Sequence, residues 1–183
     1  MKKPDENTVI LLARMIVCGF VCGCLYIFIH ELGHGAAALA FGARVLRFSP
    51  IRGFVATDGG QRGYFARQFF YAAGAILPTL SAAVYALFYK RGASPVYRIL
   101  SALYETVCAA ALFDWVLTPV LWLFRRAPRG DDCTQFLEFW TLHPLIVSAA
   151  ALLAVVLLAA LAARRGILSD FAETVRVHLD KDR

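Results

Sequence analysis

Charged residues are scarce in this sequence. Asp, Glu, Lys and Arg together make up 17% of its 183 residues, whereas 60% are hydrophobic. A soluble domain of this length cannot enclose so much apolar surface in a single core. These proportions exclude an ordinary soluble globular fold. They predict an all-α polytopic membrane protein, whose excess apolar side chains face the lipid bilayer.

Histidine and cysteine are also few, with four and five residues respectively. Cys18, Cys22, Cys24 and Cys108 lie in apolar stretches, and only Cys133 lies in a polar one. This placement does not fit the framework of a small disulfide-bonded domain. We interpret the apolar cysteines as small hydrophobic residues.

Basic residues outnumber acidic ones, and the formal net charge is +6. In a soluble protein this excess would suggest a nucleic-acid partner. Here the basic residues lie beside and between the apolar stretches, as in Lys90-Arg91, Arg125-Arg126 and Arg164-Arg165. Cations in such places anchor helices at lipid headgroups. We therefore expect the bilayer, and no nucleic acid, as a partner.

Four apolar stretches are long enough to cross a bilayer, which takes about 20 helical residues. Glycine, proline and paired basic residues separate them, and the first is too long for a cleavable signal peptide. We predict a single membrane domain, 1–183, with spans at residues 15–41, 64–89, 96–124 and 136–163.

Two further segments have recognisable patterns. Residues 45–48 and 54–57 have the composition of short strands, which predicts a small surface β-hairpin after the first span. Apolar residues recur at helical spacing in 167–183, which predicts an amphipathic helix on the membrane surface, with a frayed, solvated tail as the alternative. Four spans place both termini on one side, and the distribution of Lys and Arg favours the cytoplasmic side.

The first predicted span contains the sequence His30-Glu31-Leu32-Gly33-His34. Residues four apart on a helix share a face, so the two histidines can bind one zinc ion. Zinc lowers the pKa of a bound water, and the intervening glutamate takes its proton, which produces a nucleophile that attacks a carbonyl. Ionisable residues in an apolar helix are costly and mark functional sites. We therefore predict Zn²⁺ at His30 and His34, rather than a trio that only satisfies its own hydrogen bonds.

A catalytic zinc needs a third protein ligand. His34 lies eight residues before Gly42, at the end of the first span, and Asp114 lies eleven residues before Arg125, at the end of the third. Both are therefore about 12–16 Å from the same surface, at 1.5 Å per residue. We expect Asp114 to be the third ligand. The alternatives left open are His143, Asp131 and Asp132.

Two other acidic residues have simpler interpretations. Asp58 is expected in a turn before two glycines. Glu105 also lies in the third span, but it is nearer to the other membrane surface than Asp114 is. It is expected to pair with a neighbour.

The stretch from His30 to Gly42, HELGHGAAALAFG, resembles the active-site helix of the site-2 protease family of intramembrane zinc metalloproteases. The likeness continues through the predicted hairpin and into residues 72–78, AAGAILP, which are similar to the segment with Gly and Pro in that family's second core helix. The resemblance implies a three-helix core, here the first three spans. It also implies that His30 and His34 bind zinc, that Glu31 is the general base, and that Asp114 of the third helix completes the site.

These patterns predict a zinc metalloendopeptidase that hydrolyses a peptide bond of a membrane-associated polypeptide. One alternative is a zinc-binding pseudoprotease that holds membrane proteins, although a merely structural site has no use for Glu31 as a base. Another is a zinc or proton conduit with His30, His34, Asp114 and His143 as relay groups.

Overall fold

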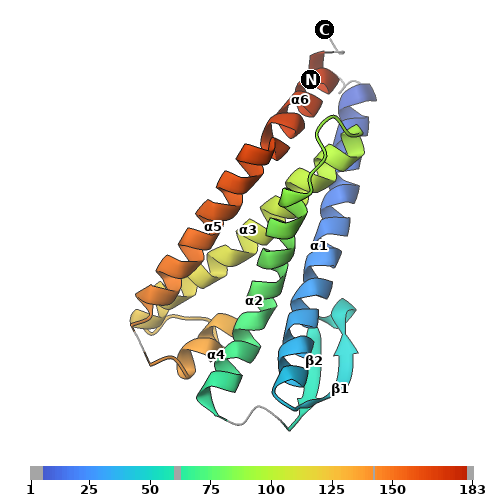
Figure 1. Ribbon diagram of the computed structural model, residues 1–183. Coiled ribbons are helices and arrows are strands. Elements are labelled where there is room, and N and C mark those ends of the chain that lie inside the picture. Colours follow the sequence, from blue (N-terminus) through green and yellow to red (C-terminus); the bar gives the residue numbers. More distant parts are fainter. Residues whose placement is uncertain (1–5, 60–62, 142, 181–183) are drawn as a thin grey trace.

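Four long helices dominate the computed structural model, which describes residues 6–59, 63–141 and 143–180 (Figure 1). They are α1 (Glu6–Ala40), α2 (Tyr64–Leu87), α3 (Pro95–Leu123) and α5 (Leu145–Arg165), and each is long and apolar enough to cross a membrane. A hairpin of β1 (Arg44–Ser49) and β2 (Phe54–Asp58), with the short helix η1 (Pro50–Arg52) between its strands, follows α1. The short helix α4 (Asp132–Glu138) precedes α5, and α6 (Ile167–Asp180) follows it.

The helices α2 and α3 coincide with the segments of the predicted second and third spans to within two residues at each end. In contrast, α1 begins nine residues before the predicted first span. Its first turns have a protein surface to pack on, because Leu11 and Cys18 are buried against Ile99 of α3. Arg14 Nη1 also lies 3.1 Å from His178 Nε2 of α6. Helix α1 therefore extends beyond the start of the predicted first span at residue 15.

The predicted fourth span divides into two helices. Helix α4 ends at Glu138 and α5 begins at Leu145, so the predicted start at residue 136 is wrong. Pro144 disfavours a helical backbone at the residue before it. Phe136 packs inward against Trp115 of α3, with the ring centroids 5.4 Å apart. The apolar residues around Phe136 therefore belong to a core between α3 and α4, and α5 alone forms the long helix.

The hairpin confirms the predicted surface strands. Its two strands are antiparallel, with Val45 opposite Thr57. Gly53 ends η1 with φ 61° and ψ 51°, a left-handed conformation that glycine adopts without a steric penalty. The hairpin lies against the second half of α1, where the rings of Phe28 and Phe48 meet edge to face.

The C-terminal segment is helical over its described residues, whereas residues 181–183 of the predicted tail lie outside them. One face of α6 packs on α1 and α3: Ile167 has no exposed surface, and Phe171 and Val175 pack against the cluster that contains Leu11 and Ile99. The alternative of a frayed, solvated tail is wrong for these residues. The location of α6 at a membrane surface stays a prediction.

Gly33 allows the backbones of α1 and α2 to approach each other. A Cβ atom at this position would collide with the carbonyl oxygen of Ala73 and lie 2.8 Å from its carbonyl carbon. A larger residue would therefore require one of the helices to move. A Cβ atom at Gly35, two residues further along the same helix, would have no atom within 4 Å.

We expect Gly33→Ala to lower the free energy of unfolding by about 1–3 kcal/mol, the usual penalty for overpacking. Gly35→Ala is the matched control, and it should be neutral or stabilising by up to about 1 kcal/mol, because alanine is the better helix former. Thermal or denaturant unfolding of the two purified variants in the same detergent measures the difference. Equal stability of the two variants would contradict the close contact between α1 and α2.

Candidate metal centre

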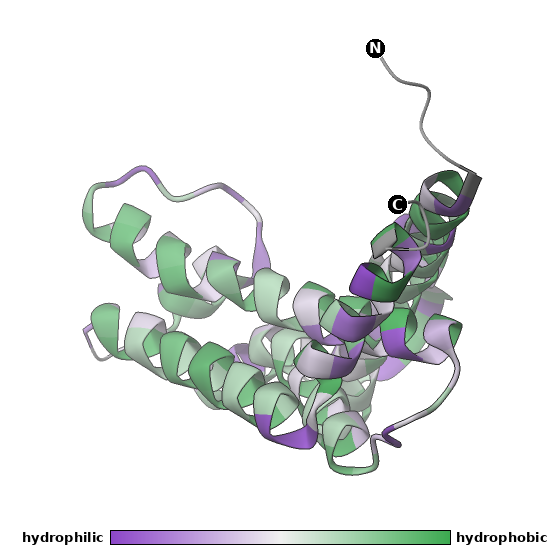
Figure 2. Cartoon of the chain, turned by 90° about the horizontal axis from the view of Figure 1, so that it is seen from above, coloured by the Kyte–Doolittle hydropathy of each residue, from purple (hydrophilic) through white to green (hydrophobic). Residues whose placement is uncertain are grey.

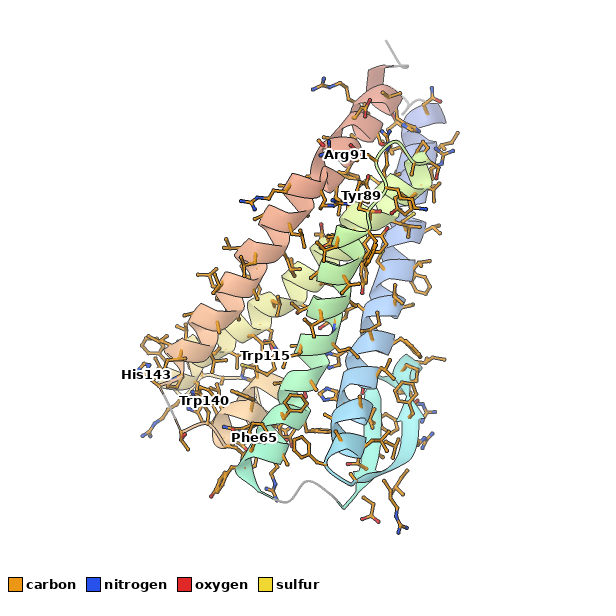
Figure 3. The ribbon with its side chains drawn as sticks, viewed as in Figure 1. Phe65, Tyr89, Arg91, Trp115, Trp140 and His143 are labelled. Carbon is orange, nitrogen blue, oxygen red and sulfur yellow. The ribbon has the colours of Figure 1, made fainter. Side chains whose placement is uncertain are left out.

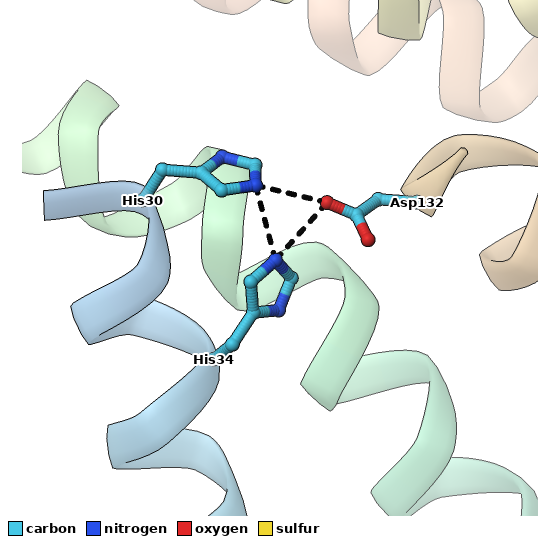
Figure 4. A group of neighbouring side chains, drawn as sticks. All are labelled: His30, His34 and Asp132. Carbon is cyan, nitrogen blue, oxygen red and sulfur yellow. Dashed lines mark hydrogen bonds and ion pairs between the residues drawn. The ribbon is translucent and has the colours of Figure 1, made fainter. Parts of the chain in front are cut away.

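Two elements that are far apart in the sequence bring three ligand atoms together. His30 and His34 project from one face of α1, and Asp132 projects from the first turn of α4 (Figure 4). Asp132 Oδ2 lies 3.0 Å from His30 Nε2 and 3.0 Å from His34 Nε2. The two Nε2 atoms are 3.1 Å apart. Among the described residues, this is the group of His, Cys, Asp or Glu side chains whose geometry suits a metal ion.

The carboxylate in this group is Asp132, one of the alternatives left open, and not the predicted Asp114. Asp114 instead accepts a hydrogen bond of 3.0 Å from Thr118, one turn further along α3. His143 is exposed and accepts a hydrogen bond from Leu145 N, at 3.3 Å. Figure 3 shows His143 at the end of α5 that lies away from α1. The structure therefore does not support Asp114 or His143 as the third ligand.

Local interactions fix Asp132 in its position. The preceding residue, Asp131, caps α4 by accepting a hydrogen bond of 2.9 Å from Thr134 N. The Thr134 hydroxyl donates to the carbonyl of Pro128 at 2.8 Å, which ties the helix start to the preceding loop. Cys133 is fully buried in the core shared by α3, α4 and α5. With its cap and its neighbour fixed, the first turn of α4 directs Asp132 toward α1.

Hydrogen bonds to the other ring nitrogens orient the histidines. His34 Nδ1 lies 2.8 Å from the backbone carbonyl oxygen of Phe70. A carbonyl only accepts, so Nδ1 carries the proton, and Nε2 of the neutral ring is left with a free lone pair. His30 Nδ1 is 3.4 Å from the Tyr26 hydroxyl, which can accept in the same way. Such partners orient metal-binding histidines in known sites.

The three converging atoms require a positive charge between them. Neutral His34 presents a lone pair to Asp132 Oδ2, and two acceptors at 3.0 Å repel each other unless a proton or a cation lies between them. Burial alone raises the pKa of Asp132, but when His30 and His34 carry a proton on Nε2, their hydrogen bonds and positive charges outweigh burial and lower the pKa to about 2. The carboxylate is therefore charged, and it favours a protonated imidazole or a metal cation beside it.

The spacing of the three atoms suits zinc. Bonds of about 2.0–2.1 Å in a tetrahedral site place neighbouring donor atoms about 3.3–3.4 Å apart. The separations of 3.0–3.1 Å between the three atoms need to lengthen only slightly. Two histidines and one carboxylate also match the donor set of catalytic zinc sites, in which a fourth position stays open.

Gly74 leaves room for the two imidazoles. A Cβ atom at Gly74 of α2 would lie 2.7 Å from the Cε1 atoms of both His30 and His34. The missing side chain therefore forms part of the site, and α2 encloses the histidines on one side. The sequence marked Gly74 through the AAGAILP segment, but the pattern did not show which residues it faces.

Glu31 lies next to the candidate metal centre, at a cavity that His30 also lines. It is 5% exposed, and its carboxyl oxygen would be 3.8 Å from a Cβ atom at Gly53. A cavity of about 360 Å³ extends from His30 and Glu31 to η1, and it is lined by Tyr26, Ile27, His30, Glu31, Ile51, Arg52 and Gly53. The loop of the hairpin therefore forms one wall of the space next to the glutamate, a feature that no sequence pattern indicated.

The structure corrects the expectation for Glu105. This residue is 5% exposed, and neither of its carboxyl oxygens has a hydrogen-bond partner among the described residues. The predicted pairing with a neighbour is therefore wrong. Asp58 is the last residue of β2 and precedes Gly59 with φ 74°, as expected at a turn, whereas Gly60 lies outside the described residues.

The chain was compared with protein-family models, with curated proteins and with solved structures, and none of these comparisons gives a match.

Proposed function

We propose that this chain is an integral membrane zinc metalloendopeptidase that hydrolyses membrane-associated polypeptides. The observation that carries the proposal is the convergence of His30, His34 and Asp132, with ligand atoms 3.0–3.1 Å apart, next to the buried Glu31 and an adjoining cavity. This arrangement combines a metal centre, a base and a space for substrate. The three features come from α1, α4 and the hairpin.

The surface of the long helices supports a location in the bilayer. Outward-facing residues of α1 include Ile16, Val17 and Phe20, which are 64%, 62% and 73% exposed. Figure 2 shows hydrophobic residues along the length of the long helices. Exposed apolar surface on this scale is unfavourable in water and typical of contact with lipid or protein. The proposal keeps both termini on the cytoplasmic side, as the distribution of Lys and Arg favours.

Zinc, when bound, would supply a Lewis acid that makes a water molecule nucleophilic at neutral pH. Glu31 would serve as the proton acceptor of such a site, because its carboxyl group adjoins the same cavity as His30. Arg52 of η1 also lines that cavity and offers a positive charge to the oxygen of a carbonyl under attack. The tautomer fixed by Phe70 keeps His34 ready to bind metal.

The substrate must expose a carbonyl, whereas the carbonyls of a helix are already bonded within the helix. A substrate segment therefore has to unwind before it is cleaved. Within the described residues the sheet has two strands, so each strand has one edge that pairs with no other strand. β2 begins directly after Gly53, at the wall of the cavity. A peptide that adds to the free edge of β2 would run toward His30 and Glu31.

Metal content tests the centre itself. We expect about one zinc per chain in the purified protein. Asp132→Ala should weaken zinc binding by more than about 100-fold, because loss of a residue that only orients a ligand already weakens it about 10–100-fold. Asp114→Ala, the matched control, should retain the metal. Elemental analysis and zinc titration of the stripped proteins measure both values. Zinc that is lost from the Asp114 variant and kept by the Asp132 variant would restore Asp114 as the ligand, and absence of zinc from the folded wild type would remove the metal centre.

Replacement of the base tests catalysis separately from metal binding. Glu31→Gln should keep the zinc but slow the cleavage of single-span peptides in proteoliposomes by about 10²–10⁴-fold, the contribution typical of a general base. Glu138→Gln alters an exposed glutamate of α4 and should leave the rate unchanged. Unchanged cleavage by the Glu31 variant would exclude the proposed role. A wild type that binds zinc and these peptides without cleaving them would favour the pseudoprotease.

The hairpin edge is tested with proline. Val55→Pro removes one backbone donor of β2 and should slow cleavage about 2- to 10-fold, the effect of one lost hydrogen bond, while zinc content stays the same. Leu46→Pro is the control in β1, because Leu46 is exposed and lies where the strand register shifts. Equal rates for Val55→Pro and Leu46→Pro would exclude binding of the substrate along β2.

A further inference from the structure

A second ionisable site lies in the interior, apart from the metal centre. Glu105 is on α3, nine residues before Asp114, and it is 5% exposed. Both of its carboxyl oxygens are enclosed, so water has no access to them, and neither has a hydrogen-bond partner among the described residues. No ion pair in the described part of the chain includes Glu105. The carboxyl group is therefore buried without compensation.

Two pairs of hydroxyl groups link α2 to the part of α3 just before Glu105. The Tyr85 hydroxyl of α2 lies 2.6 Å from the Ser101 hydroxyl of α3. The Ser81 hydroxyl of α2 lies 2.5 Å from the Tyr104 hydroxyl of α3. These two pairs connect α2 and α3 at positions four residues and one residue before Glu105 in the sequence of α3. They satisfy each other and leave the carboxyl group without a donor.

In the described part of the chain, none of the ionisable groups around Glu105 supplies a positive charge. Tyr85 of α2 and Tyr104 and Cys108 of α3 interact electrostatically with it, and Cys22 of α1 packs beside Cys108. The residues that α5 contributes to this core are apolar: Ala154, Val155 and Leu158. The α6 carboxylates Asp170 and Glu173 interact with Tyr89 and Arg98. Arg98, two turns before Glu105, is thus already paired.

An ionised carboxylate in such surroundings is strongly unfavourable. Burial of a charge without a partner has a penalty of several kcal/mol, and a carboxyl group avoids it by binding a proton. A neutral carboxyl group carries no net charge, and a proton needs no additional space in a closed interior. Proton binding is therefore the way in which this packing can tolerate Glu105.

We propose that Glu105 is a proton-binding site, which keeps the packing of α2, α3 and α5 intact only while its carboxyl group is neutral. Release of the proton leaves an uncompensated charge between these helices and loosens them, so the bundle loses stability as the pH rises. The site differs from the metal centre in its ligand and in its residues. The proposal does not depend on the peptidase function.

The charge state is measured by infrared spectroscopy of the zinc-loaded protein in lipid nanodiscs. The wild type should show a band of a protonated carboxylic acid at neutral pH that Glu105→Gln lacks and that Glu138→Gln, at an exposed position, retains. Glu105→Asp keeps a carboxyl group, so it should shift the band rather than abolish it, and it provides a second reading if the Gln variant does not fold. A protonated-acid band that is identical in the wild type and in the Glu105 variants would overturn the proposal.

Stability against pH is the second measurement on the same samples. Between mildly acidic and alkaline pH, the midpoint of thermal unfolding of the wild type should fall by at least about 3 °C more than that of Glu105→Gln. The Gln side chain mimics the neutral acid, so this variant should not show the fall. The sign follows from a folded state that favours the protonated form, since its stability is complete at low pH and is lost as the pH rises. A parallel pH dependence of the two proteins would overturn the proposal, as would a lower midpoint of the Gln variant at acidic pH.

Discussion

The candidate metal centre depends on the close approach of α1 and α2. Gly33 lets the backbone of α1 reach Ala73, and this approach places the carbonyl of Phe70 within 2.8 Å of His34 Nδ1. That hydrogen bond determines which ring nitrogen of the neutral histidine is free. Gly74 then leaves the space that both imidazoles occupy. The two glycines, Gly33 and Gly74, thus control both where the imidazoles lie and which nitrogen of His34 carries the proton. If the helices were packed farther apart, the metal centre could not form at this place.

The third ligand depends on a different kind of packing. Asp132 belongs to a helix of seven residues, which is too short to be stable by its own backbone hydrogen bonds. Its order comes from the cap at Asp131 and from the burial of Cys133 and Phe136 against α3. Trp115, the residue directly after Asp114, packs on Phe136. The large side chain next to the expected ligand therefore supports the helix that provides the carboxylate instead.

The sequence was sufficient where the signal was local. His30 and His34 share a helix face at any tertiary arrangement, and the strands of the hairpin followed from composition over a few residues. Asp132 could not be predicted in the same way, because it reaches histidines about 100 positions away through the folding of a loop and a short helix. Counting residues from the ends of the spans located Asp114 at a suitable depth but gave no information on the direction of its side chain. The backbone carbonyl of Phe70 has no signature in sequence at all, since every residue carries one.

The two buried acidic positions show how surroundings decide the chemistry of a carboxyl group. Asp132 has two imidazole nitrogens at 3.0 Å, so a proton or a cation held between these atoms compensates its charge. Glu105 has no hydrogen-bond partner or ion pair among the described residues, so none of them compensates a charge there. A cation bound at the first position joins α1 to α4, whereas a proton bound at the second lets α3 pack against α2 and α5. Because α3 contacts both α4 and the helices around Glu105, the order of the metal centre and the neutrality of Glu105 depend on the same helix.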